Sequence, residues 1–259
     1  MSDTATDADR RSIADDLRYL LVLSRPRFWL YLAGPVAVGV TYGIGDVSGL
    51  FTPTTVALAA YFLGVVLFFT GFAAFFAPLP LFLTDIGGFS SDMVFGLYLL
   101  SSLGSAAFYT AAGRLSSRID LRLLQTSALA VRAVAMPLVA VVGVALATTL
   151  LGAVLTAVLF VFIGVSWAVI AVTAGTIVTR IAPAQLRGEA LGVYAALSAL
   201  AGGIGSIGGG AVATRFGFTA AFASAGVVIV AGGALVLALR ALSTGTTVVH
   251  QTPPSASED

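Results

Sequence analysis

A short polar stretch, GRLSSRIDLR (residues 113–122), decides the fold because of what lies on either side of it. The preceding run, 93–112, has no charged residue, and the following interval, 123–179, contains a single charge, Arg132. About 20 apolar residues are enough for a helix to cross the hydrocarbon core of a bilayer. The stretch is therefore predicted to be a loop at the membrane surface between spanning helices. Its arginines favour the cytoplasmic side.

The composition of the whole chain points the same way. Of its 259 residues, 58% are apolar and 10% are charged, and the mean hydropathy is +1.02. These values lie outside the range of ordinary soluble domains. Open strands cannot satisfy their backbone groups in lipid, and nothing in the chain alternates as a membrane barrel does. We therefore predict an all-α integral membrane protein, multi-pass in the cell membrane, whose main partner is the lipid bilayer.

Charge and residue types exclude several classes of function. The net charge is +1, and the basic residues are dispersed at the ends of apolar runs, which excludes a nucleic-acid partner. The chain has no cysteine, so it has neither thiolate ligands nor a thiol nucleophile. Its one histidine, His250, lies in the polar C-terminal tail. We predict no catalytic residue, no metal site and no cofactor.

Charged residues bound seven predicted spans between two polar ends. Residues 1–19 form a polar arm, and 243–259, which contains Pro253 and Pro254, reads as a disordered tail. The second span is bent at its end by Pro78 and Pro80. The spans are 28–44, 54–83, 93–112, two within 123–179 that meet in a tight turn near 147–149, 190–212 and 217–239.

Counting arginines by side exposes a conflict between the two ends of the chain. Five arginines precede the first span; with seven crossings they share a side with Arg215, and six others fall on the opposite side. Six against six gives no orientation under the positive-inside rule. Without the first span, the other six helices carry five loop arginines on one side and one on the other. This pattern predicts a six-helix unit with both ends cytoplasmic and a seam near 61–72.

The loop at 113–122 also carries a family resemblance. It resembles the cytoplasmic loop of form G-x-L-a-D-r-x-G-r-r that joins the second and third helices of each half of a major facilitator superfamily (MFS) transporter. The stretch RGEALGVY (187–194) resembles the family's R-G-x-x-x-G at the start of a later helix. This sequence departs from the pattern at Ser117, where an acidic residue is usual, and at Asp120, where a glycine is usual.

The MFS resemblance covers residues 64–239 and implies one six-helix bundle of the two that such a transporter uses. It also implies a cytoplasmic charge gate. Solvated arginines that mark helix ends are the alternative reading, because exposed ion pairs contribute little. The implied gate residues are Gly113, Arg114, Leu115, Arg118, Asp120, Arg122, Arg187, Gly188 and Glu189.

Residues 20–63 resemble a different family. The stretch SRPRFWLY (24–31), leading into an apolar run, resembles the start of a UbiA-type membrane prenyltransferase; an interfacial anchor is the alternative. That family needs N-D-x-x-D and D-x-x-D motifs, whose carboxylates hold magnesium against an allylic diphosphate. This chain has no asparagine and no D-x-x-D. Prenyltransferase activity is therefore not expected, and we predict a chimeric chain with a UbiA-like N-terminus, 20–63, before the MFS-like part, 64–242.

Three residues are candidates for a solute cavity. Arg132 is the one charge inside a predicted span, and intramembrane arginines are functional candidates because insertion of the charge is costly. Snorkelling of the side chain to the interface is the alternative. Tyr109 and Trp167 have polar-tipped rings that suit a cavity wall, although interfacial or core packing is more common.

A glycine-rich run, GGIGSIGGG (202–210), lies inside the sixth predicted span. It superficially resembles a phosphate loop, but it lacks the Lys-Ser/Thr that follows in such loops. Small residues at this spacing favour close helix packing. We predict packing contacts at Gly202, Gly205 and Gly209.

The function predicted from these patterns is transport of a small solute by alternating access. The chain itself would supply one of the two six-helix bundles. A second bundle, from another copy of the chain or a separate chain, would complete the transporter. Two alternatives stay open, a degenerate prenyltransferase and an inactive fusion product.

Overall fold

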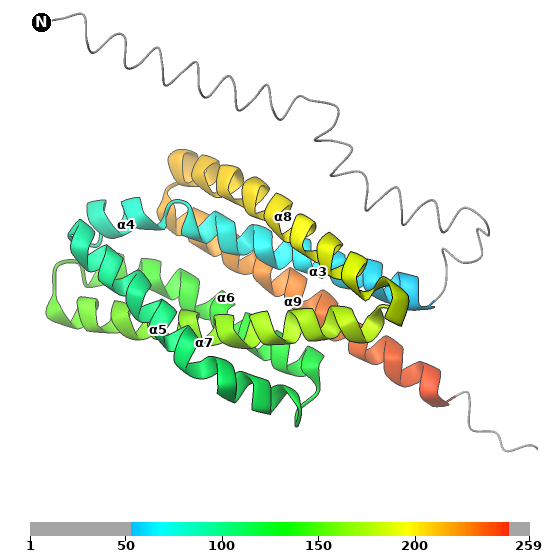
Figure 1. Ribbon diagram of the computed structural model, residues 1–259. Coiled ribbons are helices and arrows are strands. Elements are labelled where there is room, and N and C mark those ends of the chain that lie inside the picture. Colours follow the sequence, from blue (N-terminus) through cyan, green and yellow to red (C-terminus); the bar gives the residue numbers. More distant parts are fainter. Residues whose placement is uncertain (1–52, 249–259) are drawn as a thin grey trace, which may run out of the picture. The chain divides into compact units, whose positions relative to one another are not determined.

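The computed structural model describes residues 53–248, and the side-chain surroundings of residues 54–239. The predicted polar arm and the first predicted span, 28–44, lie outside the described residues, as do residues 249–259. The described chain forms, in order, α3 (Pro53–Phe76), α4 (Leu79–Asp85), α5 (Ser91–Ser116), α6 (Leu121–Ala145), α7 (Leu150–Ile181), the 3-10 helix η2 (Ala184–Leu186), α8 (Arg187–Phe216) and α9 (Phe218–Val248) (Figure 1).

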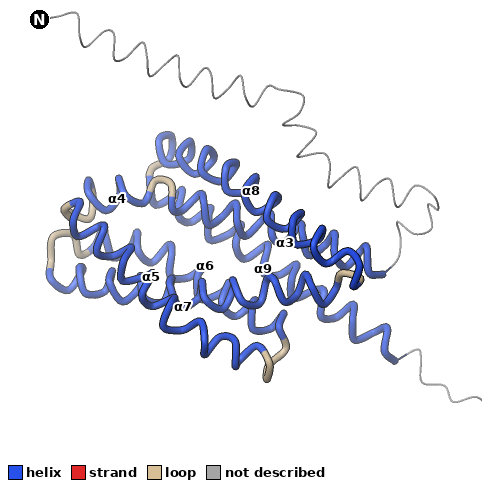
Figure 2. The backbone as a smooth tube through the Cα atoms, viewed as in Figure 1, coloured by secondary structure: helices blue, strands red, loops and turns tan. Residues whose placement is uncertain are grey.

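Residues 53–248 contain no strand (Figure 2). Six helices of this part are long and apolar enough to cross a membrane, with α3 and α4 together making the first of them. The prediction of an all-α membrane protein is confirmed, and so are the positions of the last six spans. The helices run further than predicted at several ends, since charged residues at a membrane surface do not stop a helix.

Local chemistry sets the helix boundaries. The Ser90 hydroxyl accepts a hydrogen bond from the backbone N–H of Met93 and caps α5. The Thr149 hydroxyl caps α7 in the same way, in the tight turn predicted near 147–149. Such caps satisfy N–H groups that the first helical turn leaves without partners. Pro78 separates α3 from α4, and Gly217, at a φ of +86°, turns the chain between α8 and α9.

The six spans form two groups of three. Helices α3, α8 and α9 pack together, α5 and α6 pack on α7, and the two groups meet where α6 contacts α9 (Figure 1). Exchanging α3 with α7, α5 with α8, and α6 with α9 leaves the main contacts unchanged. The two members of each exchanged pair run in opposite directions. This arrangement is an inverted repeat, as in the nested repeats of each half of an MFS transporter.

The chain direction puts most of the loop arginines at one end of the bundle. The α5–α6 and α7–α8 connections lie at that end, with Arg114, Arg118 and Arg122 at the first connection and Arg180 and Arg187 at the second. Arg215, in the last turn of α8, lies at the other end. The bundle therefore has the charge asymmetry expected for the six-helix unit. The cytoplasmic assignment of the arginine-rich end stays a prediction.

The predicted boundary between residues 63 and 64 falls inside α3, which is continuous from Pro53 to Phe76. Gly64, on this helix, packs against α9, where a side chain would meet Val236 and the carbonyl of Gly232. The division into UbiA-like and MFS-like segments concerns ancestry and stays a prediction.

A buried polar contact joins α3 to α6 and α7. The Tyr61 hydroxyl lies 3.2 Å from Oε1 of Gln125 and 3.5 Å from the carbonyl of Ala174, and both polar side chains are fully buried. A buried amide that loses its partner costs about 1–2 kcal/mol.

Tyr61→Phe is therefore expected to lower the thermal unfolding midpoint by about 2–8 °C. Adding Gln125→Leu should recover most of this loss, because both polar groups are then gone. Tyr109→Phe, at an exposed hydroxyl, is the matched control. A Tyr61→Phe protein that melts like the control would show that the contact does not stabilise the fold.

Candidate functional site

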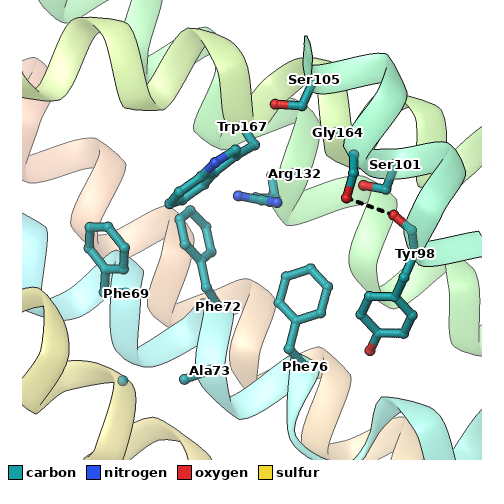
Figure 3. Close-up of a pocket in the computed structure, with 12 residues that line it drawn as sticks. Phe69, Phe72, Ala73, Phe76, Tyr98, Ser101, Ser105, Arg132, Gly164 and Trp167 are labelled. Atoms are coloured by element: carbon teal, nitrogen blue, oxygen red, sulfur yellow. Dashed lines mark hydrogen bonds between the residues drawn. The ribbon is translucent and has the colours of Figure 1, made fainter. Parts of the chain in front are cut away.

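A cavity of about 480 Å³ lies among α3, α5, α7 and α8, open on one side. Arg132, near the middle of α6, also lines this cavity. Close approach of α5 and α7 shapes one wall, because Gly164 lies against the backbone of Ser101. The residues that line the cavity are Phe69, Phe72, Ala73, Phe76, Tyr98, Ser101, Ser102, Ser105, Arg132, Gly164, Trp167 and Gly202 (Figure 3).

The Arg132 guanidinium is surrounded by aromatic rings. Its Cζ lies 4.4 Å from the ring centroid of Phe72, 5.4 Å from that of Trp167 and 5.7 Å from that of Phe76. In Figure 3, Trp167 and Phe72 stand on one side of the guanidinium and Gly164 on the other. A cation over a ring face gains about 2 kcal/mol when desolvated. The rings therefore offset part of the cost of burying this charge.

Hydrogen bonding leaves the same guanidinium incompletely satisfied. Arg132 is 3% exposed, and its Nη2 donates to the carbonyl of Ile163 at 3.2 Å. Its Nε and Nη1 atoms are buried without a partner. A guanidinium carries five N–H donors, so most of them are unused here. Arg132 thus turns into the bundle, away from the interface to which snorkelling would have taken it.

Carboxylates lie far along the helices from Arg132. The acidic residues in the part of the chain with described side chains are Asp85, Asp92, Asp120 and Glu189, each at or next to a helix end. Among these described residues, no His, Asp or Glu cluster could hold a metal ion. A charge at a helix centre costs about 2.5–3.5 kcal/mol on insertion scales. Within the described chain, this cost is not offset by an ion pair.

The α5 side of the cavity supplies hydroxyl groups. Ser102 donates to the carbonyl of Tyr98 at 2.9 Å, within its own helix. Ser105 is buried, and its hydroxyl has no partner. Tyr98, Ser101, Ser102 and Ser105 share one helical face because they are spaced by three and four residues. The cavity wall from α5 is therefore polar, in contrast to the aromatic wall from α3.

Among the predicted cavity residues, Arg132 and Trp167 lie together in this site. Tyr109 is 40% exposed on α5 and does not line the cavity. The α3 and α5 walls of the cavity were not predicted from the sequence. The spacing of Phe69, Phe72 and Phe76 places them on one helical face and could have indicated the α3 wall. A helical face that is buried in a core has the same spacing, so the pattern does not distinguish the two cases.

Two of the three glycines predicted to pack, Gly205 and Gly209, lie against the backbone of α3. A Cβ at Gly205 would collide with the carbonyl of Thr70, and one at Gly209 with the backbone of Ala74. Both glycines thus let α8 approach α3 closely. Gly202 was wrongly predicted as a packing contact: a Cβ there would meet nothing within 4 Å, and the residue faces the cavity instead.

The predicted gate residues are arranged differently from a simple loop. Gly113, Arg114 and Leu115 belong to the last turns of α5, and Arg187, Gly188 and Glu189 to the first turn of α8. The Asp120 carboxylate caps α6 by accepting from the N–H groups of Arg122 and Leu123.

Arg122 ties this end of α6 to α9, donating from Nη1 to the carbonyl of Leu239 at 2.7 Å. Arg114, Arg118, Arg187 and Glu189 are exposed and form no ion pair with other described residues. The gate role of the motif stays a prediction.

Comparison with known proteins gives two kinds of match. The short matches are to lycopene elongase/hydratases: that of Halobacterium salinarum is 67% identical over 46 residues, 18% of this chain and 17% of the relative. That of Haloferax volcanii is 61% identical over 51 residues, 20% of this chain and 17% of the relative. The chain thus spans only a small part of these relatives. No solved structure matches it significantly.

The long match is to a family model. The model described as Major Facilitator Superfamily matches residues 6–206 and, in a second overlapping match, residues 61–257. The described part of the chain has the six spans and the inverted repeat expected of one bundle of that family. With a match over most of its length, the chain belongs to the major facilitator superfamily.

Proposed function

We propose that this protein moves a small solute across the cell membrane by alternating access, as an MFS-type half transporter. The observation that carries the proposal is the open cavity with Arg132 at mid-span depth. Transporter sites lie near the bilayer midplane between bundles that rock against each other. Intramembrane charges that face a cavity mark such pathways.

A second six-helix bundle, from another copy of this chain or a separate chain, would close the open side of the cavity. Two of the helices that line the cavity, α5 and α8, also have the most uncovered surface of the six spans. Less than a fifth of the apolar window of α5, and likewise of α8, is buried within the chain (17% in each case). Large apolar side chains such as Phe95, Leu103 and Ile207 are exposed on these two helices.

The absence of native cysteine allows a direct test of alternating access. Ser102→Cys would place a thiol in the cavity, Ser116→Cys one at the arginine-rich end and Ser91→Cys one at the opposite end. A membrane-impermeant thiol reagent is then applied to sealed cells and to inside-out vesicles. We expect Ser116→Cys and Ser91→Cys to react from opposite sides only, and Ser102→Cys to react from both. Labelling of Ser102→Cys from one side alone would contradict transport.

We further propose that residues 20–63 are a UbiA-like segment of separate origin. High identity to lycopene elongase/hydratases over only 46 to 51 residues supports a short segment with its own history. Because these relatives are lycopene elongase/hydratases, an enzyme of that kind is the second candidate function. The missing N-D-x-x-D and D-x-x-D motifs argue against it. Magnesium-dependent consumption of a prenyl diphosphate by the purified chain would overturn this ranking.

A further inference from the structure

We infer that the cavity binds a small organic anion with an apolar body, and that the anionic group pairs with Arg132. The inference rests on the proposed function in taking this cavity as the solute site. It adds the chemical class of the solute, and three features of the site carry it: an uncompensated charge, a set of unused donors and an aromatic wall.

The charge requires a negative partner. Arg132 is almost fully buried, and the described chain places no carboxylate beside it. The ring faces of Phe72, Trp167 and Phe76 attract the cation without neutralising it. A buried charge normally has an ion pair or equivalent hydrogen bonds. An anion that enters the open side of the cavity supplies both.

The unused donors match an oxyanion. Arg132 keeps Nε and Nη1 without partners, and the buried Ser105 hydroxyl is also unpartnered. All of these groups can donate, and guanidinium donors bind carboxylate oxygens strongly because the hydrogen bonds are charge-assisted. Both residues line the same cavity, so one carboxylate has donors available from α6 and from α5.

The aromatic wall requires an apolar body on the ligand. Phe69 and Phe72 are edge-on to Trp167, and their ring centroids lie 6.0 Å and 6.3 Å, respectively, from the Trp167 centroid. Phe76 extends the wall toward Tyr98. Apolar atoms gain by leaving water for such a surface. The volume of about 480 Å³ lies within the usual range of small-molecule sites. A bare inorganic ion would leave most of this surface unused.

The test measures binding to the full chain in nanodiscs of phosphatidylcholine, which has no net charge. Of the two tryptophans, Trp29 is replaced by phenylalanine, so that Trp167 in the cavity reports occupancy by its fluorescence. The probes are cyclohexanecarboxylate, its neutral amide, the cation cyclohexylmethylammonium, and acetate, which lacks the apolar body. We expect saturable binding of the carboxylate, at least tenfold tighter than the amide and acetate, and no binding of the cation.

Variants assign the preference to the site. Arg132→Gln should abolish the preference for the carboxylate over the amide, Arg132→Lys should keep part of it, and Ser105→Ala should weaken carboxylate binding several-fold. Arg215→Gln, the same change at an exposed helix end, should leave binding unchanged. If Arg132→Gln fails to fold, the lysine and Ser105 variants still decide the result.

Several outcomes would overturn the inference. These are equal binding of amide and carboxylate, binding of the cation, or an Arg132→Lys protein with unaltered affinity and preference. Loss of carboxylate binding when phosphatidylglycerol is added would identify a lipid headgroup as the occupant instead. If the cavity binds the anion but Ser102→Cys is labelled from one side only, the proposed transport function is rejected and the inferred solute class stands. If Ser102→Cys is labelled from both sides but the cavity shows no preference for the anion, the inferred solute class is rejected and the transport function stands.

Discussion

Replacing Gly209 by leucine is expected to prevent α8 from packing on α3. A Cβ at this position would collide with three backbone atoms of Ala74: the carbonyl oxygen, the carbonyl carbon and Cα. Because the obstacle is helix backbone, rotation of a side chain cannot relieve it. Overpacking a core costs about 1–3 kcal/mol when side chains can adjust, and more when they cannot. We therefore expect little or no folded Gly209→Leu protein, measured as the monodisperse fraction in size-exclusion chromatography and as the thermal unfolding midpoint.

The control for this variant lies one residue away. Gly208→Leu introduces the same side chain on the same helix, at a site where a Cβ would meet nothing within 4 Å. It should therefore leave the yield and unfolding midpoint close to those of the native protein. Similar behaviour of the two variants would show that the α3–α8 contact does not depend on a small residue at 209.

Reversing the charge of Arg132 is the second change with a large expected effect. In Arg132→Glu, a carboxylate would face the ring faces that now attract a cation, and these faces carry negative potential. It would also be buried with no cation beside it among the described residues. Leaving a buried charge uncompensated costs about 3–5 kcal/mol. We expect a strong fall in the unfolding midpoint and in the amount of protein inserted in the membrane.

Two variants separate charge from position. Arg132→Lys retains a cation for the rings and should lose much less stability than Arg132→Glu. Arg215→Glu makes the same reversal at an exposed helix end and should be close to neutral. If Arg132→Glu melts within a few degrees of the native protein, the aromatic surroundings of Arg132 do not stabilise the fold through its positive charge.

Hydropathy predicted the spans well for a definite reason. In lipid, every backbone group must be bonded within its own helix, so a long uncharged run has few alternatives to a spanning helix. Ser90 and Thr149 then end their runs by capping the next helix. The helix ends near Gly113 and Arg187 were placed less well. Arginine at a membrane surface tolerates both helix and loop, so charge alone does not set the boundary.

The site was predicted only in part. The lone charge inside a span made Arg132 conspicuous, but its direction was not predictable, because a mid-span arginine either snorkels or turns inward according to its neighbours. Tyr109 and Trp167 were equally good candidates for the cavity wall by residue type, but only Trp167 lines the cavity. Which face of α5 turns inward depends on the contact of Ser101 with Gly164, two residues far apart in the chain.

The sequence by itself determined that this protein is helical and membrane-embedded, where its last six spans run, and which end of the six-helix bundle collects arginine. Each of these follows from local composition, because a helix needs about 20 apolar residues to cross the bilayer and the charged residues lie in the loops between spans. The tertiary structure alone decided that Phe72, Ser105, Arg132 and Trp167 meet around one cavity and that Gly205 and Gly209, but not Gly202, pack on α3. Helix rotation and pairing are set by long-range packing, and that information is distributed over all the helices rather than contained in any one of them.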